Sequence, residues 1–209
     1  MQRIAIIDYG MGNVRSVQKA IEFVSPDDEV ILTHDKKYIE NSDRVVFPGQ
    51  GAIGGCMKVL NEMGLTNPIK KAANEKPFLG ICLGLQMLFD WSEENAGTNG
   101  LSIFEGIVKH FQSVELKVPH MGWNTVHQTK EHILWQGIND NARFYSVHSY
   151  YVNPASDVEV GSTNYGFDFC SAAARDNIFA VQFHPEKSQK DGLKLLSNFV
   201  RWMPDVQKN

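Results

Sequence analysis

Short runs of consecutive apolar residues alternate with segments of helical periodicity along the first half of the chain. Such runs are typical of parallel strands buried on both faces, and they occur at residues 4–7, 30–32, 44–47 and 78–81. Between them, apolar residues recur at helical spacing within residues 14–24, 55–61 and 68–74. A further helix is predicted directly after the fourth run, through Leu85, Leu88 and Phe89. This alternation predicts a parallel sheet with helices on both faces.

The second half contains short segments that are rich in β-branched and aromatic residues and are broken by Gly, Asn and Asp. Strands are therefore predicted near residues 106–111, 123–127, 144–147, 158–162, 169–174 and 179–183. A final helix is predicted to begin near Ser188, a candidate N-cap with Asp191 three residues later. Its apolar stripe comprises Leu193, Leu196, Phe199, Val200 and Met203.

No internal repeat, low-complexity tract or linker divides these segments. The chain has 209 residues, which is enough for one domain with a substantial core. We therefore predict a single α/β domain over residues 1–209. Its central sheet is expected to be mixed, mostly parallel and flanked by helices, with an antiparallel β region in the second half.

Composition and charge narrow the function classes. Apolar residues make up 43% and charged residues 21%, as in soluble globular proteins. The net charge is −4 and the basic residues are scattered, so neither nucleic acid nor an anionic membrane is an expected partner. No apolar run approaches the roughly 20 residues that cross a bilayer. The N-terminus does not resemble a signal peptide, and a cytoplasmic protein is expected.

The three cysteines do not form a recognisable framework. An odd count argues against a set of disulfides. None of the three stands at zinc-ligand spacing from another, so no metal site is expected. Cys56 and Cys170 fit small buried apolar residues.

Cys82 stands in the pattern Gly-x-Cys-x-Gly between a predicted strand and a predicted helix. This is the thiol form of a nucleophile elbow, whose tight turn leaves no room for a Cβ at Gly80 or Gly84. The turn places the sulfur at a helix N-terminus, which favours thiolate. It also makes the N–H of Leu83 a candidate oxyanion donor. Taken alone, the pattern equally fits a buried cysteine in a Gly-containing turn.

His184-Pro185-Glu186 follows a strand-like run just before the last predicted helix. A thiol nucleophile needs a general base, and a third group must orient that base. Ligands of an open parallel sheet gather at the carboxyl ends of its strands, so His184 and Cys82 can meet there. Alone, this segment is more typical of surface residues at a helix start; beside the elbow, it indicates a Cys-His-Glu triad. The other six histidines lack such a pairing, and most are interpreted as surface or core residues.

Gly-Ile-Cys-Leu-Gly-Leu-Gln followed by a distant Phe-His-Pro-Glu resembles the class I glutamine amidotransferases. The resemblance covers the whole chain and implies a flavodoxin-like fold. It also implies that Cys82 attacks glutamine to form a γ-glutamyl thioester, which water hydrolyses after ammonia leaves. His184 and Glu186 complete the catalytic triad by this resemblance.

Further segments resemble the glutaminase subunits of imidazole glycerol phosphate synthases. They are residues 8–13, 15–17, 119–124, 147–151 and 183–188. The resemblance implies an oxyanion hole from the backbone of Gln50 and Gly51 together with Leu83, in a loop where the family often has Val in place of Gln50. It implies glutamine-binding roles for Gly49, Gln86, Ser149 and Tyr150.

The same resemblance implies a partner, a (β/α)₈ cyclase subunit that uses the ammonia in histidine biosynthesis, together forming a heterodimer. Asn13, Met121 and Trp123 are the expected interface residues. The glutaminase is expected to be weak alone and to be activated by the cyclase's ligand, through rearrangement of the loop at residues 48–51. No Gly-Lys-Ser/Thr phosphate loop is present, and neither ATP nor another cofactor is expected.

Several alternatives stay open on the sequence. The chain could be the glutaminase of another synthase, such as the pyridoxal phosphate or anthranilate systems, although residues 119–124 disfavour both. It could be a paralogue that supplies ammonia for a sugar modification in a lipopolysaccharide pathway. Outside this class, a catalytically silent scaffold or a thiol hydrolase of the same fold would also account for the pattern.

Overall fold

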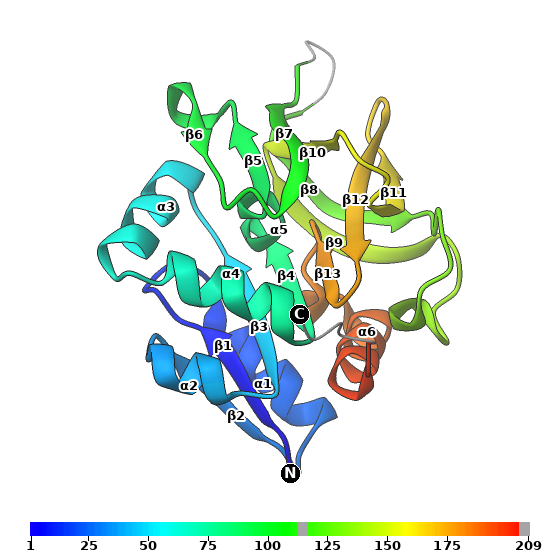
Figure 1. Cartoon of the computed structure of the whole chain (residues 1–209). Coiled ribbons are helices and arrows are strands. Elements are labelled where there is room, and N and C mark those ends of the chain that lie inside the picture. Colours follow the sequence, from blue (N-terminus) through cyan, green and yellow to red (C-terminus); the bar gives the residue numbers. More distant parts are fainter. Residues whose placement is uncertain (113–116, 205–209) are drawn as a thin grey trace.

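Five parallel strands, four from the first half of the chain and one from near its end, form one part of the main sheet (Figure 1). The structure, a computed structural model, describes residues 1–112 and 117–204. In spatial order the five strands are β2 (Glu29–Thr33), β1 (Arg3–Ile7), β3 (Arg44–Gly49), β4 (Phe78–Cys82) and β13 (Ile178–Val181). They coincide with the four apolar runs of the first half and with the last predicted strand.

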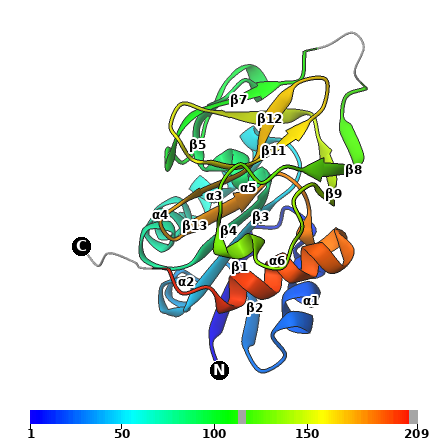
Figure 2. The same cartoon turned by 90° about the vertical axis from the view of Figure 1, so that its right-hand side faces the viewer.

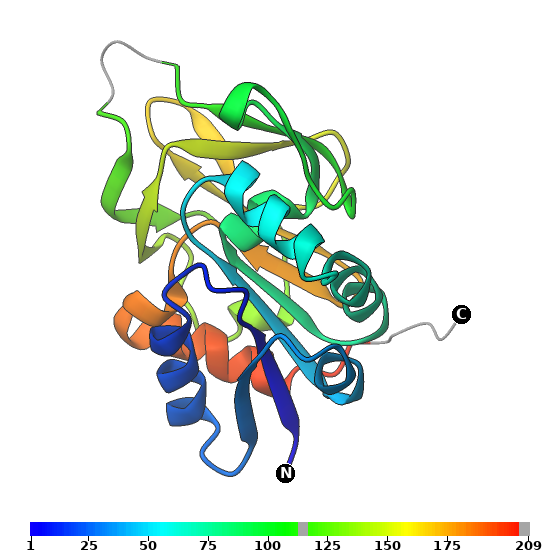
Figure 3. The ribbon, with the colours of Figure 1, turned by 90° about the vertical axis from the view of Figure 1, so that its left-hand side faces the viewer.

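Helices cover both faces of this parallel part. On one face lie α1 (Val14–Val24) and α6 (Gln189–Arg201), which face the viewer in Figure 2. On the other face lie α2 (Lys36–Asn41), α3 (Ile53–Glu62) and α4 (Thr66–Glu75), seen in Figures 1 and 3. Alternate strand residues serve the two layers. Ile4 and Ile6 belong to the core under α1 and α6, whereas Ala5 and Ile7 belong to the opposite core.

The main sheet continues beyond β13 with a mostly antiparallel part, as predicted for the second half. Its strands in spatial order are β12 (Asp168–Arg175), β10 (Tyr150–Pro154), β7 (Phe104–His110), β5 (Phe89–Ser92) and β6 (Thr98–Asn99), with β11 (Glu159–Asn164) beside β12. A separate antiparallel pair is formed by β8 (His120–Val126) and β9 (Ala142–His148). Three 3₁₀ turns complete the described elements: η1 (Glu94–Ala96), η2 (Ile133–Trp135) and η3 (Pro185–Lys187).

The register of the central strands brings three distant segments together. Gly49 at the end of β3 is paired with Cys82 at the end of β4. On the other side of β4, Ile81 is paired with Val181 at the end of β13. The loop after β3, Cys82 and the His184 segment therefore lie together at the carboxyl ends of these neighbouring strands, where parallel folds bind ligands.

The helix that follows Cys82 is shorter than predicted. It is α5 (Leu83–Met87), and Phe89 instead begins strand β5. The Leu88 carbonyl accepts hydrogen bonds from the N–H groups of Ile103 and Phe104, and the Phe89 carbonyl accepts one from Ser102. Pairing with this distant segment replaces helical bonding, although the apolar spacing suits either element.

The predicted N-cap position of the last helix was right, whereas one residue of its predicted apolar stripe was wrong. Met203 lies beyond the end of α6 and is 81% exposed, so it is not part of the buried stripe. Ser188 occupies the N-cap position, but its hydroxyl does not cap the helix. The hydroxyl instead donates to the His184 carbonyl and accepts from the Tyr145 N–H, at 2.6 and 3.0 Å. Among the described residues, no helix is both long and apolar enough to span a bilayer.

Candidate active site

Cys82 occupies a strained turn between β4 and α5. Its φ of 56° and ψ of −112° lie in a region that residues other than glycine rarely adopt. A Cβ at Gly84 would approach the Phe47 carbonyl oxygen to 1.9 Å, and one at Gly80 would lie 2.9 Å from the Cβ of Ala180. The two glycines are therefore needed for the close packing that the elbow pattern predicted.

His184 and Glu186 form a buried pair directly after β13. Nδ1 of His184 lies 2.9 Å from Oε1 of Glu186, and the two side chains are only 5% and 1% exposed. The backbone N–H of His184 also donates a hydrogen bond to the backbone carbonyl of Tyr145 at 2.8 Å. Because the Glu186 carboxylate is an acceptor, Nδ1 carries a proton. The opposite ring nitrogen, Nε2, points away from Glu186.

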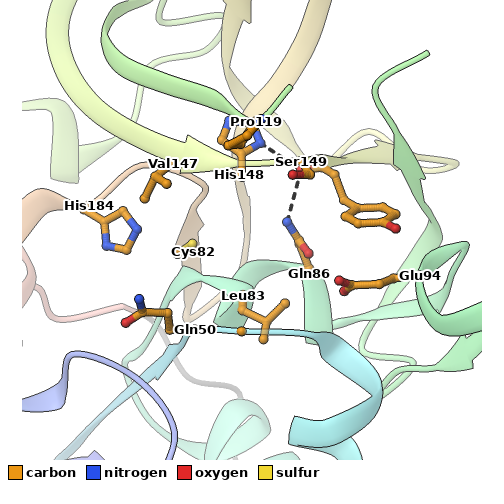
Figure 4. A pocket seen from close by; sticks show the side chains of 12 residues that line it. Gln50, Cys82, Leu83, Gln86, Glu94, Pro119, Val147, His148, Ser149 and His184 are labelled. Carbon is orange, nitrogen blue, oxygen red and sulfur yellow. Dashed lines mark hydrogen bonds between the residues drawn. The ribbon is translucent and has the colours of Figure 1, made fainter. Parts of the chain in front are cut away.

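Nε2 of His184 faces the cavity that Cys82 also lines (Figure 4). This buried nitrogen makes no well-aligned hydrogen bond with the described residues, yet the Cys82 thiolate is close enough to act on its charge. Burial disfavours the imidazolium, but the Cys82 thiolate and the Glu186 carboxylate outweigh burial and raise the pKa of His184 to about 10. The arrangement places a protonated imidazole beside the sulfur, where it can serve a cysteine nucleophile as acid and base.

The cavity above Cys82 has a volume of about 290 Å³. Gln50, Cys82 and His184 line one end (Figure 4), and Gly51 and Leu83 also line the cavity. The remaining lining residues are Gln86, Glu94, Pro119, Val147, His148, Ser149 and Tyr150. The structure thus brings most of the predicted oxyanion and glutamine-binding residues to one cavity.

Gln86 is held in one orientation by its neighbours. Its amide nitrogen donates to the Tyr150 carbonyl at 3.1 Å and to Oε1 of Gln182 at 3.0 Å. Because both partners are acceptors, the amide cannot be flipped, and Oε1 is the atom that Gln86 can offer to a ligand. Nε2 of Gln182 in turn lies 3.8 Å from the Cys82 sulfur.

Glu94 was missed by the sequence analysis. It belongs to the short η1 turn, and its Oε2 accepts a hydrogen bond from the Ile53 N–H at 2.9 Å. Its side chain and that of Gln86 lie at the same end of the cavity (Figure 4). Two oxygen acceptors, one of them a carboxylate, suit a cationic ligand group there. Nothing in the local sequence indicates this position, because it depends on how η1 packs on α3.

Other residues around the cavity were also missed. Pro119, Val147 and His148 line it, and Gln182 supports it from β13's end. Gln182 had an available signal, since it lies two residues before His184 at the end of an apolar run. Gly49, by contrast, does not line the cavity. A Cβ there would lie 2.9 Å from Leu83 Cβ and from the Tyr9 hydroxyl, so this glycine permits close packing beside Cys82.

The predicted interface residues lie outside the cavity. Met121 and Trp123 project from β8 and are 61% and 38% exposed. Asn13 precedes α1, and its side-chain oxygen accepts a hydrogen bond from the Ser16 hydroxyl at 2.9 Å. Within residues 1–112 and 117–204, no group of three or more His, Cys, Asp or Glu side chains is arranged to hold a metal ion.

Comparison with known proteins gives a family over nearly the whole chain. The sequence model of the family described as glutamine amidotransferase class-I matches residues 5–202. A relative from Nitrosospira multiformis, named imidazole glycerol phosphate synthase subunit HisH, is 53% identical, with 98% of this chain and 100% of that protein covered. A relative of the same name from Aromatoleum aromaticum is 54% identical, again with 98% and 100% covered.

Solved structures confirm the predicted fold class. The chain resembles one in PurLQS from Thermotoga maritima with a TM-score of 0.75 and 18% identity, over 96% of this chain and 99% of that chain. A glutamine amidotransferase from the same organism gives a TM-score of 0.66 and 18% identity, over 96% of both chains. At this identity the likeness concerns the fold alone.

Proposed function

The chain belongs to the class I glutamine amidotransferase family, and from this premise we propose that it is the glutaminase subunit of an imidazole glycerol phosphate synthase in histidine biosynthesis. The observation that carries the activity is the cavity in which Cys82 and the Glu186-bound His184 converge. The full-length similarity to the named synthase subunits supports the pathway.

In the first half of the reaction, the Cys82 thiolate attacks the side-chain carbonyl carbon of glutamine. The carbonyl oxygen becomes an oxyanion, which the N–H of Leu83 and the backbone of Gln50 and Gly51 would stabilise. When the tetrahedral intermediate collapses, the His184 imidazolium donates its Nε2 proton to the leaving nitrogen. Ammonia departs and a γ-glutamyl thioester remains on Cys82.

In the second half, water hydrolyses the thioester. Neutral His184 takes a proton from water as the water oxygen adds to the thioester carbonyl. The carbon–sulfur bond then breaks, which releases glutamate and restores the thiolate–imidazolium pair. Throughout, Glu186 holds the proton on Nδ1 of His184. The released γ-carboxyl group loses its proton to solvent, so the balance is one glutamine and one water consumed for one glutamate, one ammonia and one proton.

The far end of the cavity suits the amino-acid end of glutamine. The α-ammonium group would lie against Oε1 of Gln86 and the Glu94 carboxylate, because both are acceptors. Ser149 and Tyr150 line the same region. Glutamine would thereby be held at both ends, with its amide above Cys82.

The ammonia is proposed to pass to a cyclase subunit, because the relatives are named as subunits of a synthase. Exposed Met121 and Trp123, together with Asn13, are the proposed contact residues of a heterodimer. We propose that the cyclase's ligand activates the glutaminase through the loop at residues 48–51. Three free cysteines fit the reducing cytoplasm as the place of action.

Trapping the thioester tests the activity. The protein, with its cyclase subunit and the cyclase's ribotide ligand, would be given glutamine and hydroxylamine, and γ-glutamyl hydroxamate would be measured. We expect Cys82→Ala to lower hydroxamate formation by about 10⁴-fold or more, as removal of a nucleophile does. Cys170→Ala removes a different buried thiol and should leave the rate near that of the wild type. Equal hydroxamate formation with and without Cys82 would exclude the proposed chemistry.

A further inference from the structure

Two buried histidines, one on β8 and one on β9, lie beside the cavity. His120 and His148 are 3% and 6% exposed, and they face each other across the β8–β9 pair. Nδ1 of His120 lies 2.9 Å from Nε2 of His148. The rings of Phe111, Tyr165 and Phe169 pack around the pair and bury most of its surface. Neither histidine has a role in the reaction described above.

The hydrogen-bond pattern fixes where each proton lies. The amide of Asn124 cannot flip, because its oxygen accepts from the Thr125 N–H at 2.8 Å and its nitrogen donates to the Asn164 carbonyl at 2.9 Å. The same nitrogen lies 3.2 Å from Nε2 of His120, so this ring nitrogen is the acceptor. His120 therefore carries its proton on Nδ1 and donates it to Nε2 of His148.

The same donor-to-acceptor order of hydrogen bonds continues from His148 to the wall of the cavity. Since Nε2 of His148 accepts, its proton lies on Nδ1, which is 2.8 Å from the Tyr150 carbonyl oxygen. That oxygen also accepts the Gln86 amide at 3.1 Å (Figure 4). A single chain of hydrogen bonds thus runs from Asn124 through both histidines to the carbonyl that orients Gln86.

The chain requires both rings to be neutral. A second proton on either histidine would place two N–H groups against each other, at Asn124 or between the rings. Burial lowers the pKa of His120. Burial and the nearby His120 and His184, opposed by the Tyr150 carbonyl, lower the pKa of His148 to about 3. The pair consequently keeps its proton arrangement at neutral pH.

We propose that His120 and His148 are positioning residues that set the enzyme's selectivity for the α-amino end of its substrate. They hold the Tyr150 carbonyl as an acceptor for the Gln86 amide nitrogen, and so direct Oε1 of Gln86 to the substrate ammonium. This role rests on the proposed glutaminase function. The described hydrogen bonds of the two residues run to Asn124 and the Tyr150 carbonyl and not to Cys82, so we expect them to act on recognition rather than on the chemical step.

The selectivity is tested with glutamine and with glutaramate, which lacks the α-amino group. Both would be hydrolysed by the protein in complex with its cyclase subunit and ribotide ligand. In His148→Leu, we expect the preference for glutamine over glutaramate, taken as a ratio of kcat/KM values, to fall by about tenfold or more. This is the scale of one hydrogen bond to a charged group. The change should appear mainly in KM for glutamine.

Two further variants separate positioning from folding. His148→Asn should retain most of the preference, because its amide nitrogen can still donate to the Tyr150 carbonyl. His132→Leu makes the same chemical change at a histidine that packs between Phe179 and Trp202, away from the cavity, and should leave the preference unchanged. A wild-type preference in His148→Leu, or an equal loss in His132→Leu, would overturn the proposal.

Nitrogen-15 NMR of the histidine rings tests the chain without any activity. Both His120 and His148 should be neutral with the proton on Nδ1 at pH 7, whereas a proton on Nε2 or a charged ring would contradict the chain. If the wild-type protein does not hydrolyse glutamine, the proposed function and the selectivity role are both rejected, and the NMR result still decides whether the proton arrangement exists. The two failures are thereby distinguished.

Discussion

At the scale of single residues, the charge on His184 depends on which groups surround it. Burial alone would keep the imidazole neutral. The Cys82 thiolate and the Glu186 carboxylate reverse this preference, and Nδ1 stays bonded to Glu186 at 2.9 Å. The resting enzyme therefore already holds on His184 the proton that the leaving ammonia needs.

Removal of the Cys82 sulfur should let burial lower the pKa of His184. In Cys82→Ala we expect the pKa of His184 to fall from its raised value of about 10, because burial is then opposed by Glu186 alone. NMR titration of the His184 ring in the wild type and the variant measures this difference. Indistinguishable titrations in the two proteins would mean that Cys82 is not the residue that holds the proton on His184.

The same pKa shift has a stability consequence with a definite sign. The pKa of His184 is raised in the folded state, so its contribution to the free energy of unfolding is fully present below the unfolded value of about 6.5. That contribution is lost as the pH rises toward about 10. Denaturant unfolding across this window should show the loss in the wild type and a smaller loss in Cys82→Ala.

The site residues that form motifs along the chain are predictable from the sequence, whereas those that meet only in the fold are not. Cys82, His184 and Glu186 stand in short patterns whose chemistry is recognisable. Glu94 reaches the cavity from a 3₁₀ turn, and His148 is directed by a residue 28 positions away. Such roles depend on tertiary contacts, which the spacing of residues along the chain does not predict.

At the scale of elements, the end of β4 and the start of α5 leave almost no space between them and β3. Gly84 packs directly against the Phe47 carbonyl. This contact lets α5 begin at the residue after Cys82, and it sets the position of the Leu83 N–H at the helix start. The elbow is consequently sensitive to one added methyl group.

Gly84→Ala should destabilise the protein by about 3 kcal/mol, the upper part of the usual range for overpacking, because its Cβ would lie 1.9 Å from a backbone oxygen. Gly55→Ala in α3 is the matched control. There the nearest atom to an added Cβ is the Met11 methyl at 3.8 Å, so a gain of about 0.5–1 kcal/mol is expected from helix propensity. Denaturant midpoints measure both. Equal stabilities for the two variants would contradict the packing described for the elbow.

The elements themselves were predictable where burial is continuous. Strands β1, β3 and β4 are apolar runs covered on both faces, the edge strand β2 is a partly buried apolar run, and α1 has a clear apolar stripe. Helix α2 was missed because Ile39 is its one buried residue. Strands β5, β6 and β10 were missed because they are short or half-exposed, and their pairing with β7 and with one another is set by the fold rather than by local pattern.

At the scale of the whole molecule, the two sheets carry different tasks. The parallel part of the main sheet brings Cys82 and the loop after β3 together at the carboxyl ends of its strands, whereas the separate β8–β9 pair carries the outward-facing Met121 and Trp123 and the inward-facing histidine pair. A partner bound on β8 would therefore sit over an element that is hydrogen-bonded to the cavity wall. This placement supports activation of the glutaminase by its proposed partner.

The most direct test of the central claim is glutamate release from glutamine by this protein with the cyclase subunit, in the presence and absence of the cyclase's ribotide ligand. We expect the ligand-bound complex to exceed the isolated chain by about 5- to 150-fold, the usual range of coupling between sites. Cys82→Ala should abolish the release. Trp123→Ala should weaken the stimulation, while Trp91→Ala, equally exposed at 37% on β5, should not. If glutamate release depended on Cys82 but had the same rate with and without the cyclase and its ligand, the assignment to this synthase would be contradicted.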